Sequence, residues 1–198
     1  MRLWGKLHRV AAAVQSPSAM PSPDFQQNYY ALFDLPLGFA VDQAHLGARY
    51  RQLQGELHPD RYANGSAQEQ RIAVQYSALV NEAYATLRKP LDRALYLLRL
   101  AGLSDEEISR QQIDGGFLML QIELREKLEA IPGMVDPDTA LDHLVVEIRD
   151  DIKQLQTQFS ETYASNDISA AAVTGVKMQY LDKLLFEAEQ IESDLMEK

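Results

Sequence analysis

Few side chains in this chain are suited to bond-making chemistry. Its 198 residues include no cysteine, which excludes disulfides, thiol nucleophiles and thiolate metal ligands. The four histidines, His8, His45, His58 and His143, are scattered and form no HExxH-like pair. A zinc site would have to be built from lone histidines and carboxylates. We therefore predict no metal site, no cofactor and no catalytic residues.

The triplet His58, Pro59 and Asp60 is the best candidate for a functional group. Proline stiffens the backbone, the carboxylate can accept hydrogen bonds from an arginine on a partner, and histidine can donate or accept. A catalytic His/Asp dyad would need a nucleophile, and none stands nearby in the sequence. The triplet therefore favours a binding loop over an active site.

Helical patterns flank this triplet on both sides. Asp42 suits an N-cap, and the apolar stripe after it must end before Pro59. Ser66 and Glu69 have the spacing of a capping box, which opens a second helix. Pro90 suits the first turn of a short third helix, which Gly102 can close. The apolar stripe of the first helix consists of Leu46, Tyr50, Leu53 and Leu57.

The remainder of the chain predicts longer helices. Residues 103–112 are polar and suggest a linker or a tight elbow, and helical patterns then cover about 113–131, 137–164 and 168–197. These lengths and short connections are typical of an antiparallel three-helix bundle. We predict an all-α protein in which an N-terminal helical hairpin precedes this C-terminal bundle.

Residues 117–131, FLMLQIELREKLEAI, carry apolar side chains on two faces of the predicted helix. At about 100° per residue, Phe117, Leu120, Leu124, Leu128 and Ile131 form the core face. Leu118, Met119 and Ile122 lie on another side, with Glu126 and Glu129. Two interpretations remain open. The second face is either buried against the rest of the chain or exposed as a docking stripe.

Charge is distributed unevenly along the chain. Residues 1–27 carry a net charge of +2, residues 28–102 carry +1, and residues 103–198 carry −13. Such asymmetry suggests two modules with different partners, and the acidic second half argues against a nucleic acid ligand. No apolar run approaches the length of a membrane span, so we expect no membrane association.

The N-terminal residues 1–27 form a separate segment in composition. Proline and serine punctuate it, which predicts a disordered extension. The opening stretch MRLWGKLHRVAAAV is basic and weakly amphipathic, so it fits a mitochondrial presequence. The interpretation we favour is a dispensable extension, with Met20 as a candidate true start.

Residues 28–88 resemble a J-domain. The segment Tyr29–Leu35 (YYALFDL), the HPD loop at 58–60 and the segment Asn81–Arg88 (NEAYATLR) carry the resemblance. It implies that residues 28–102, a J-domain with a connecting helix, bind a DnaK/HscA-class heat-shock ATPase and accelerate its ATP hydrolysis. The implied chaperone-binding residues are His58, Pro59 and Asp60, with Arg49, Arg51 and Arg61 as a basic patch. That patch is thinner than the family usually has.

Over residues 28–198 the order of motifs resembles the HscB/Jac-type co-chaperones. These motifs are PLDRALYLL at 90–98, FLMLQIELRE at 117–126 and YLDKL at 180–184. The resemblance implies that residues 113–198 bind an IscU-type iron–sulfur scaffold and deliver it to the chaperone. The implied contacts are Leu118, Met119, Ile122, Glu123, Glu126 and Tyr180, where the family often has phenylalanine. One acidic family position falls on Ala130.

Two other functions are weighed against this adaptor. A general J-domain co-chaperone that recruits unfolded clients would carry a Gly/Phe-rich linker and a β-rich client domain, and neither is present in the sequence. A carboxylate-metal enzyme would need the Glu-x-x-His pairs of di-iron bundles. The sequence has no such pair, so we predict no enzyme. The absence of an N-terminal CxxC pair suits a bacterial cytoplasmic protein. A mitochondrial matrix protein is the alternative if residues 1–20 are a presequence.

Overall fold

Every element in the described part of the chain is a helix, as the sequence predicts. The computed structural model describes residues 24–57, 59–63 and 65–197, with only the backbone of Pro59 and Asp60. The elements are α1 (Tyr29–Leu32), α2 (Gln43–Leu57), the 3₁₀ helix η1 (Pro59–Tyr62), α3 (Ala67–Arg88), α4 (Pro90–Leu100), α5 (Asp105–Ser109), α6 (Gly115–Ala130), the 3₁₀ helix η2 (Ile131–Gly133), α7 (Pro137–Ala164) and α8 (Ile168–Met196).

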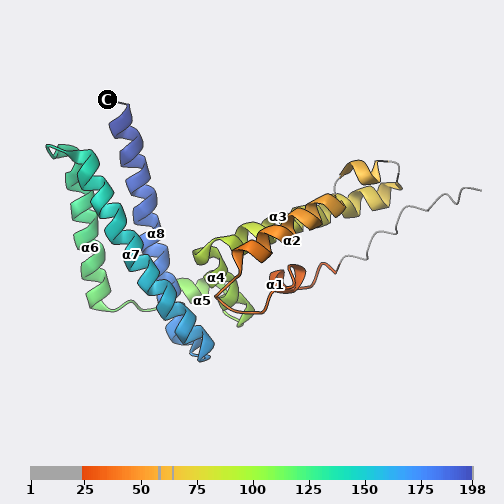
Figure 1. Ribbon diagram of the computed structural model, residues 1–198. Coiled ribbons are helices and arrows are strands. Elements are labelled where there is room, and N and C mark those ends of the chain that lie inside the picture. The colour runs from red at the N-terminus through yellow and green to blue at the C-terminus, as the bar shows by residue number, and fades with distance from the viewer. Residues whose placement is uncertain (1–23, 58, 64, 198) are drawn as a thin grey trace, which may run out of the picture.

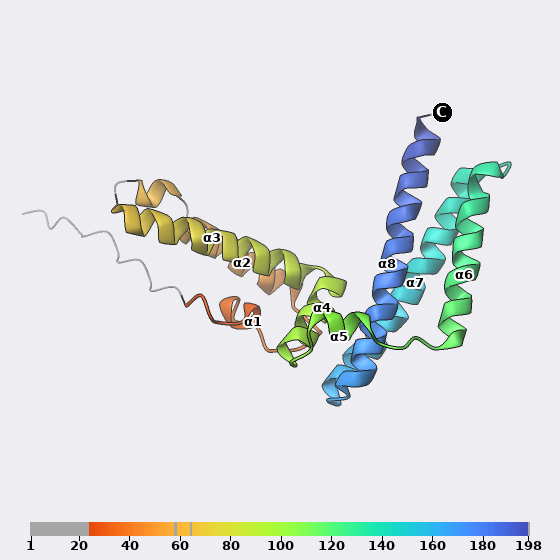
Figure 2. The ribbon, with the colours of Figure 1, turned by 180° about the vertical axis from the view of Figure 1, so that it is seen from behind.

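The helices form two arms that meet at a wide angle (Figures 1 and 2). Antiparallel α2 and α3 make the hairpin arm, while α6, α7 and α8 make the bundle arm. The short helices α4 and α5 lie where the arms meet. The α6–α7 turn and the C-terminal end of α8 lie at the end of the bundle that is remote from the hairpin. The η1 turn lies at the other end of the molecule, at the tip of the hairpin arm, and so far from the bundle (Figure 1).

Capping interactions set several helix boundaries where the sequence predicts them. Asp42 accepts hydrogen bonds from the backbone N–H groups of Ala44 and His45 at 2.9 and 3.0 Å. At the start of α3, Ser66 Oγ accepts from the Glu69 N–H at 3.2 Å, and Glu69 Oε2 accepts from the Ser66 N–H at 2.7 Å. These bonds satisfy N–H groups that have no partner inside the helix.

Two segments differ from the sequence-based expectation. The segment 103–112 contains α5, which a second capping box opens: Ser104 Oγ accepts from the Glu107 N–H at 3.2 Å. The extension predicted for 1–27 is described only from Asp24 onward, so the presequence question lies outside the described residues. Gln27 Nε2 donates to Tyr76 Oη at 3.2 Å, and Phe25 packs edge-on against the Tyr76 ring. The end of that segment therefore packs on α3.

The first hydrophobic core joins the two arms. Its buried residues come from α1 to α5, from the C-terminal half of α7 and from the N-terminal half of α8. Phe159 of α7 is fully buried and packs against Phe39 of the α1–α2 loop, with ring centroids 5.0 Å apart. A Cβ atom at Gly175 would lie 3.2 Å from Leu98 Cδ1, so α4 and α8 approach closely there. The α8 residues buried in this first core are Ala171, Ala172, Val176 and Met178.

The second core fills the remote part of the bundle. It consists of Phe117, Leu124, Leu128, Ile131, Leu141, Leu144, Ile148, Leu181, Leu184 and Ala188. Four of the five residues predicted for the core face of α6 are buried in it, and Leu120 is half-buried. Both α7 and α8 contribute to the two cores. The hairpin arm is therefore joined to α7 and α8 through α4, α5 and the α1–α2 loop.

A buried arginine stabilises the junction between the arms. Pro90 ends α3, because proline has no N–H to continue the helical ladder, and this leaves terminal carbonyls without helical donors. Arg93 Nη1 donates to one of them, Leu87 O, at 2.6 Å. The Arg93 guanidinium also lies over the Phe39 ring, 4.9 Å from its centroid. Arg93 therefore links α3, α4 and the α1–α2 loop.

Candidate functional site

The residues that directly follow the HPD triplet are held against the end of α2. Tyr62 Oη donates to Glu56 O at 3.0 Å, and Arg61 Nη1 donates to Gly55 O at 3.2 Å. Both bonds satisfy carbonyls near the C-terminal end of α2, where helical donors run out. His58 lies outside the described residues, and Pro59 is placed by its backbone as the first residue of η1.

A polar network ties the two helices of the hairpin together. Tyr50 Oη and Gln54 Nε2 both donate to Asn81 Oδ1, at 2.9 and 2.7 Å. The rings of Tyr50 and Tyr84 stack with their centroids 3.9 Å apart. Asn81 and Tyr84 belong to the NEAYATLR segment that closes the J-domain pattern. This segment fixes the alignment of α3 on α2, from which the HPD loop extends.

The three arginines proposed for the chaperone patch do not share one surface. Arg49 and Arg51 are two residues apart on α2, so they point about 200° apart. Arg51 and Arg61 are exposed, whereas Arg49 is half-buried with its Nε 3.0 Å from Asp34 Oδ2. This contact is an ion pair without hydrogen-bond alignment. Asp34 lies fifteen residues before Arg49, in the α1–α2 loop, and no local sequence signal predicts the pair.

The second apolar face of α6 is exposed. Leu118, Met119 and Ile122, which we call the docking stripe, have 42, 56 and 50 % of their surface exposed. The core-facing Leu124 of the same helix is completely buried. The interpretation in which both faces are buried is therefore wrong. At the junction α4 and α5 pack on α8, and the described residues leave this side of α6 uncovered.

Tyr180 of α8 lies beside the docking stripe. Its ring centroid is 6.3 Å from that of Phe117, the residue next to Leu118, and the Tyr180 side chain is 38 % exposed. Farther along the same seam between α6 and α8, Arg125 Nη2 lies 3.2 Å from Glu187 Oε1. Tyr180 therefore lies next to the turn of α6 that carries Leu118, although more than fifty residues separate Tyr180 from that turn in the chain.

Electrostatic contacts anchor the first turn of α6. Asp114 is its N-cap and accepts a hydrogen bond from the Phe117 N–H at 2.9 Å. Asp114 also pairs with Lys177 of α8, and the Lys177 Nζ lies 5.3 Å from the centroid of the Phe117 ring. Hydrogen bonding to Lys177, followed by the bond from Phe117, lowers the pKa of Asp114. Sequence reasoning missed Lys177 and Arg125, which hold α6 on α8 beside the docking stripe.

Two carboxylates border the docking stripe. Glu126 follows Ile122 by one helical turn, so it continues the same face, while Glu123 lies toward the opposite edge from Arg125. Both side chains are exposed. Ala130, onto which the resemblance places an acidic position, is exposed as well and follows Glu126 by one further turn. The polar rim is thus acidic along the middle of α6 and ends at Ala130.

The described residues show neither a metal cluster nor a membrane span. Within residues 24–57, 59–63 and 65–197, no three histidine or carboxylate side chains gather in a way that could hold a metal ion. None of the described helices is both long and apolar enough to cross a membrane. The features that remain as candidates for function are the HPD loop and the surface around the docking stripe.

Comparison with known proteins places the chain in a family. Residues 113–189 match the family described as the HSCB C-terminal oligomerisation domain. The co-chaperone protein HscB homolog of Aeromonas hydrophila is 41 % identical over 170 residues, which cover 86 % of this chain and 99 % of that protein. The chain belongs to the HscB co-chaperone family. This confirms the resemblance noted in the sequence.

Solved structures of HscB proteins share the architecture. Chaperone HscB from Vibrio cholerae is 37 % identical, with a TM-score of 0.76, and the match covers 85 % of this chain and 99 % of that one. Human co-chaperone protein HscB is 30 % identical, with a TM-score of 0.80, over 95 % of this chain and 92 % of that one. The all-α arrangement is therefore that of the HscB co-chaperones.

Proposed function

We propose that this protein is an adaptor in iron–sulfur cluster assembly. Its bundle arm, residues 113–198, binds an IscU-type scaffold through the docking stripe, Tyr180 and the carboxylates Glu123 and Glu126. Its J-domain arm, residues 28–102, binds an HscA/DnaK-class ATPase and stimulates ATP hydrolysis through the HPD loop. The adaptor acts by binding in the cytoplasm of a bacterium, and the only catalysis involved belongs to its ATPase partner.

The observation that carries this proposal is the exposure of the docking stripe. Three neighbouring apolar side chains, each at least 42 % exposed, lie on a helix whose opposite face is packed in the core. Clustered exposed apolar residues on a globular protein mark an interface, and methionine is common on adaptable binding surfaces. The acidic border favours a partner with basic residues around its own apolar patch.

The arrangement of the two arms suits delivery. The turn η1, which begins at Pro59, is at the free end of the hairpin, and α6, which carries the docking stripe, belongs to the bundle (Figure 1). The shared core between the arms limits their relative movement. A scaffold bound to the stripe is therefore held at a set position relative to the ATPase that engages the loop. This is how an adaptor raises the effective concentration of one partner near another.

The direct test replaces Leu118, Met119 and Ile122 together with alanine. Because the side chains are exposed, stability should change by about 0.5 kcal/mol or less per site. Affinity for a purified IscU-type scaffold, measured by calorimetry, should fall steeply, because a few apolar anchors carry most of an interface's binding energy, with about 2 kcal/mol or more at the best ones. A folded triple variant that binds the scaffold with unchanged affinity would refute the proposed interface.

Two variants serve as controls for the triple substitution. Val74→Ala changes an exposed residue of α3 (60 % exposed) and should leave scaffold affinity unchanged. Leu124→Ala changes the buried face of α6 and should cost about 2–5 kcal/mol of stability. Together they separate loss of an interface from loss of the fold.

The J-domain arm is tested by Asp60→Asn, with His58→Gln as a second variant. Each should abolish stimulation of the HscA-class ATPase and leave scaffold affinity unchanged, because the loop is on the other arm. Steady-state ATP hydrolysis with and without the variant provides the measurement. Full stimulation by either variant would contradict the role assigned to the loop.

A further inference from the structure

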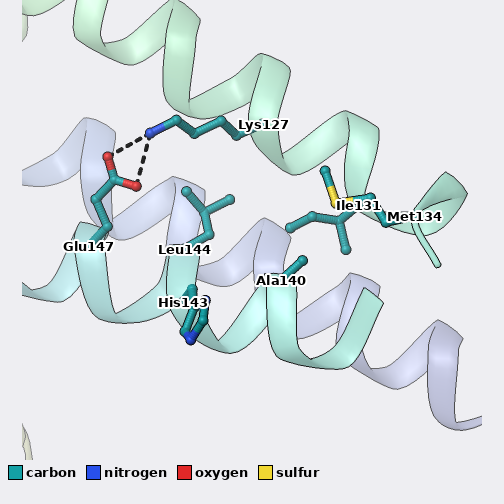
Figure 3. Close-up of a pocket in the computed structure, with 7 residues that line it drawn as sticks. All are labelled: Lys127, Ile131, Met134, Ala140, His143, Leu144 and Glu147. Atoms are coloured by element: carbon teal, nitrogen blue, oxygen red, sulfur yellow. Dashed lines mark hydrogen bonds and ion pairs between the residues drawn. The ribbon is translucent and has the colours of Figure 1, made fainter. Parts of the chain in front are cut away.

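The remote end of the bundle carries a second apolar surface. Where α6 turns through η2 into α7, Met134 is 45 % exposed and Val135 is fully exposed. Beside them lies an open cavity of about 270 Å³, here called the tip notch. Figure 3 shows its lining side chains: Ile131, Met134, Ala140, His143 and Leu144, with the ion pair of Lys127 and Glu147 at one edge.

The size and chemistry of the tip notch fit an aliphatic side chain. A buried apolar cavity of about 150 Å³ is large enough for benzene, so the notch has room for a leucine or isoleucine side chain. Ile131 and Leu144 are core residues whose edges form its walls. Such pockets accept the apolar anchors that dominate protein interfaces. The exposed Val135 adds apolar surface at the same turn.

The surrounding charge selects the kind of partner. Between Lys127 and Glu147 the chain has five acidic residues and one basic residue, a net charge of −4. The basic residue, Lys127, donates to both carboxylate oxygens of Glu147, at 2.7 and 2.9 Å. The tip is therefore acidic and repels a second copy of itself, nucleic acid and anionic lipid. A segment rich in lysine or arginine has the complementary charge.

The tip notch and the docking stripe lie on different sides of α6. Lys127 faces α7, where it pairs with Glu147, whereas Arg125 faces α8, where it pairs with Glu187. Arg125 and Lys127 therefore point about 200° apart around α6. A ligand in the notch therefore leaves the stripe accessible.

We propose that the tip notch is a further protein-docking surface, which takes one aliphatic side chain from a partner segment rich in lysine or arginine. This surface is separate from the scaffold and chaperone interfaces and adds a third contact to the adaptor. The occupant is a protein segment, because a side chain in the notch and basic residues around it must be presented together.

The test uses the full chain and the synthetic peptide KKALAKK. Methyl NMR spectra should show saturable shifts of the signals of Ile131, Met134 and Leu144, which line the notch, on titration. Replacing the central leucine with alanine removes the anchor, and replacing the lysines with glutamate reverses the charge. Each change should weaken binding about tenfold or more, which corresponds to about 1.4 kcal/mol. Equal binding of the leucine and alanine peptides would overturn the proposal, because attraction would then be only electrostatic.

Variants of the protein make the test specific to the notch. Ala140→Leu fills the cavity from its half-buried rim, and Val135→Ser removes apolar surface at a fully exposed site, where folding is not at risk. Both should lower the affinity for the leucine peptide about tenfold. Phe186→Ala, at an α8 residue that is 60 % exposed, should leave that affinity unchanged. Unchanged affinity in both notch variants would overturn the proposal.

Two further outcomes would assign the tip notch to a different occupant. One is sedimentation that shows a wild-type dimer which Ala140→Leu dissociates, because the notch would then bind a second copy. The other is that vesicles of phosphatidylglycerol shift the same methyl signals more strongly than the peptide does. Either result would overturn the proposal. A protein that is monomeric, shows no methyl shifts with such vesicles and binds the leucine peptide would support it.

Discussion

At the scale of single residues, Arg93 shows how one side chain can stabilise a junction. It is 6 % exposed, and no carboxylate among the described residues pairs with it. Burial lowers the pKa of its guanidinium, which reflects the cost of holding a charge away from water. That cost is offset by the hydrogen bond to Leu87 O and by the contact with the Phe39 ring.

We therefore expect Arg93→Met to lower the free energy of unfolding by about 1–3 kcal/mol. Methionine has a similar length but cannot donate to Leu87 O, and a buried carbonyl without a partner costs about that much. Urea denaturation followed by circular dichroism measures the change. Arg99→Met, which breaks the exposed ion pair with Asp105, should cost no more than about 1 kcal/mol. Equal losses in the two variants would contradict this account of Arg93.

At the scale of elements, most helix starts and stops were predictable from local signals. The Ser66–Glu69 capping box and Pro90 each act within one helical turn, and the structure places α3 and α4 accordingly. The same capping-box spacing at Ser104 and Glu107 opens α5. Sequence analysis missed that helix, because five residues are too few to show an apolar period.

The exposure of the docking stripe was not predictable from the sequence. Leu118, Met119 and Ile122 have the same residue types whether a neighbouring element covers them or not. The answer depends on how the junction packs, where Phe39 of the α1–α2 loop contacts Phe159 and Leu98 of α4 lies against Gly175. The same reasoning applies to Arg49, whose pairing with Asp34 depends on the folding of a loop.

Ser66→Ala tests the capping of α3 beside the HPD loop. The variant should lose about 1 kcal/mol of stability at neutral pH, because the hydroxyl no longer accepts from the Glu69 N–H. Amide hydrogen exchange should rise in the first turn of α3. An unchanged exchange rate in that turn would show that the cap does not hold the helix start.

The Ser66 cap should also depend on pH. Hydrogen bonds from the Ser66 backbone N–H and then its hydroxyl lower the pKa of Glu69 below its ordinary value of 4.5. A lowered pKa means a contribution that is complete above 4.5 and is lost as the pH falls through the lower folded-state value. The difference in unfolding free energy between wild type and Ser66→Ala should therefore shrink in acid. A constant difference across that range would contradict the coupling.

At the scale of the whole molecule, the two arms share helices. The C-terminal half of α7 and the N-terminal half of α8 belong to the junction core, while their other halves belong to the bundle core. A helix of 29 residues such as α8 cannot lose one half cheaply while it keeps the other, because both halves are packed. We expect the arms to unfold in a single cooperative transition.

Phe159→Ala tests this cooperativity. The ring is completely buried, so its removal should cost about 3–5 kcal/mol. Native-state hydrogen exchange should show an equal loss of protection at slowly exchanging amides of α3 and of α6, although Phe159 is on neither helix. If α3 lost protection and α6 kept it, the arms would unfold separately.

The shared helices have a consequence for modularity. A chimera that exchanges J-domains between relatives at residues 103–112 would cut beside α5. The surface on which the J-domain arm, residues 28–102, packs lies far downstream, around Phe159 and in the first half of α8. The grafted arm would pack against α7 and α8 of a different protein, including the close approach at Gly175. Functional chimeras should therefore require residues 155 to 178 to come from the same relative as the new J-domain arm. The stretches that must be exchanged together are separate in the sequence.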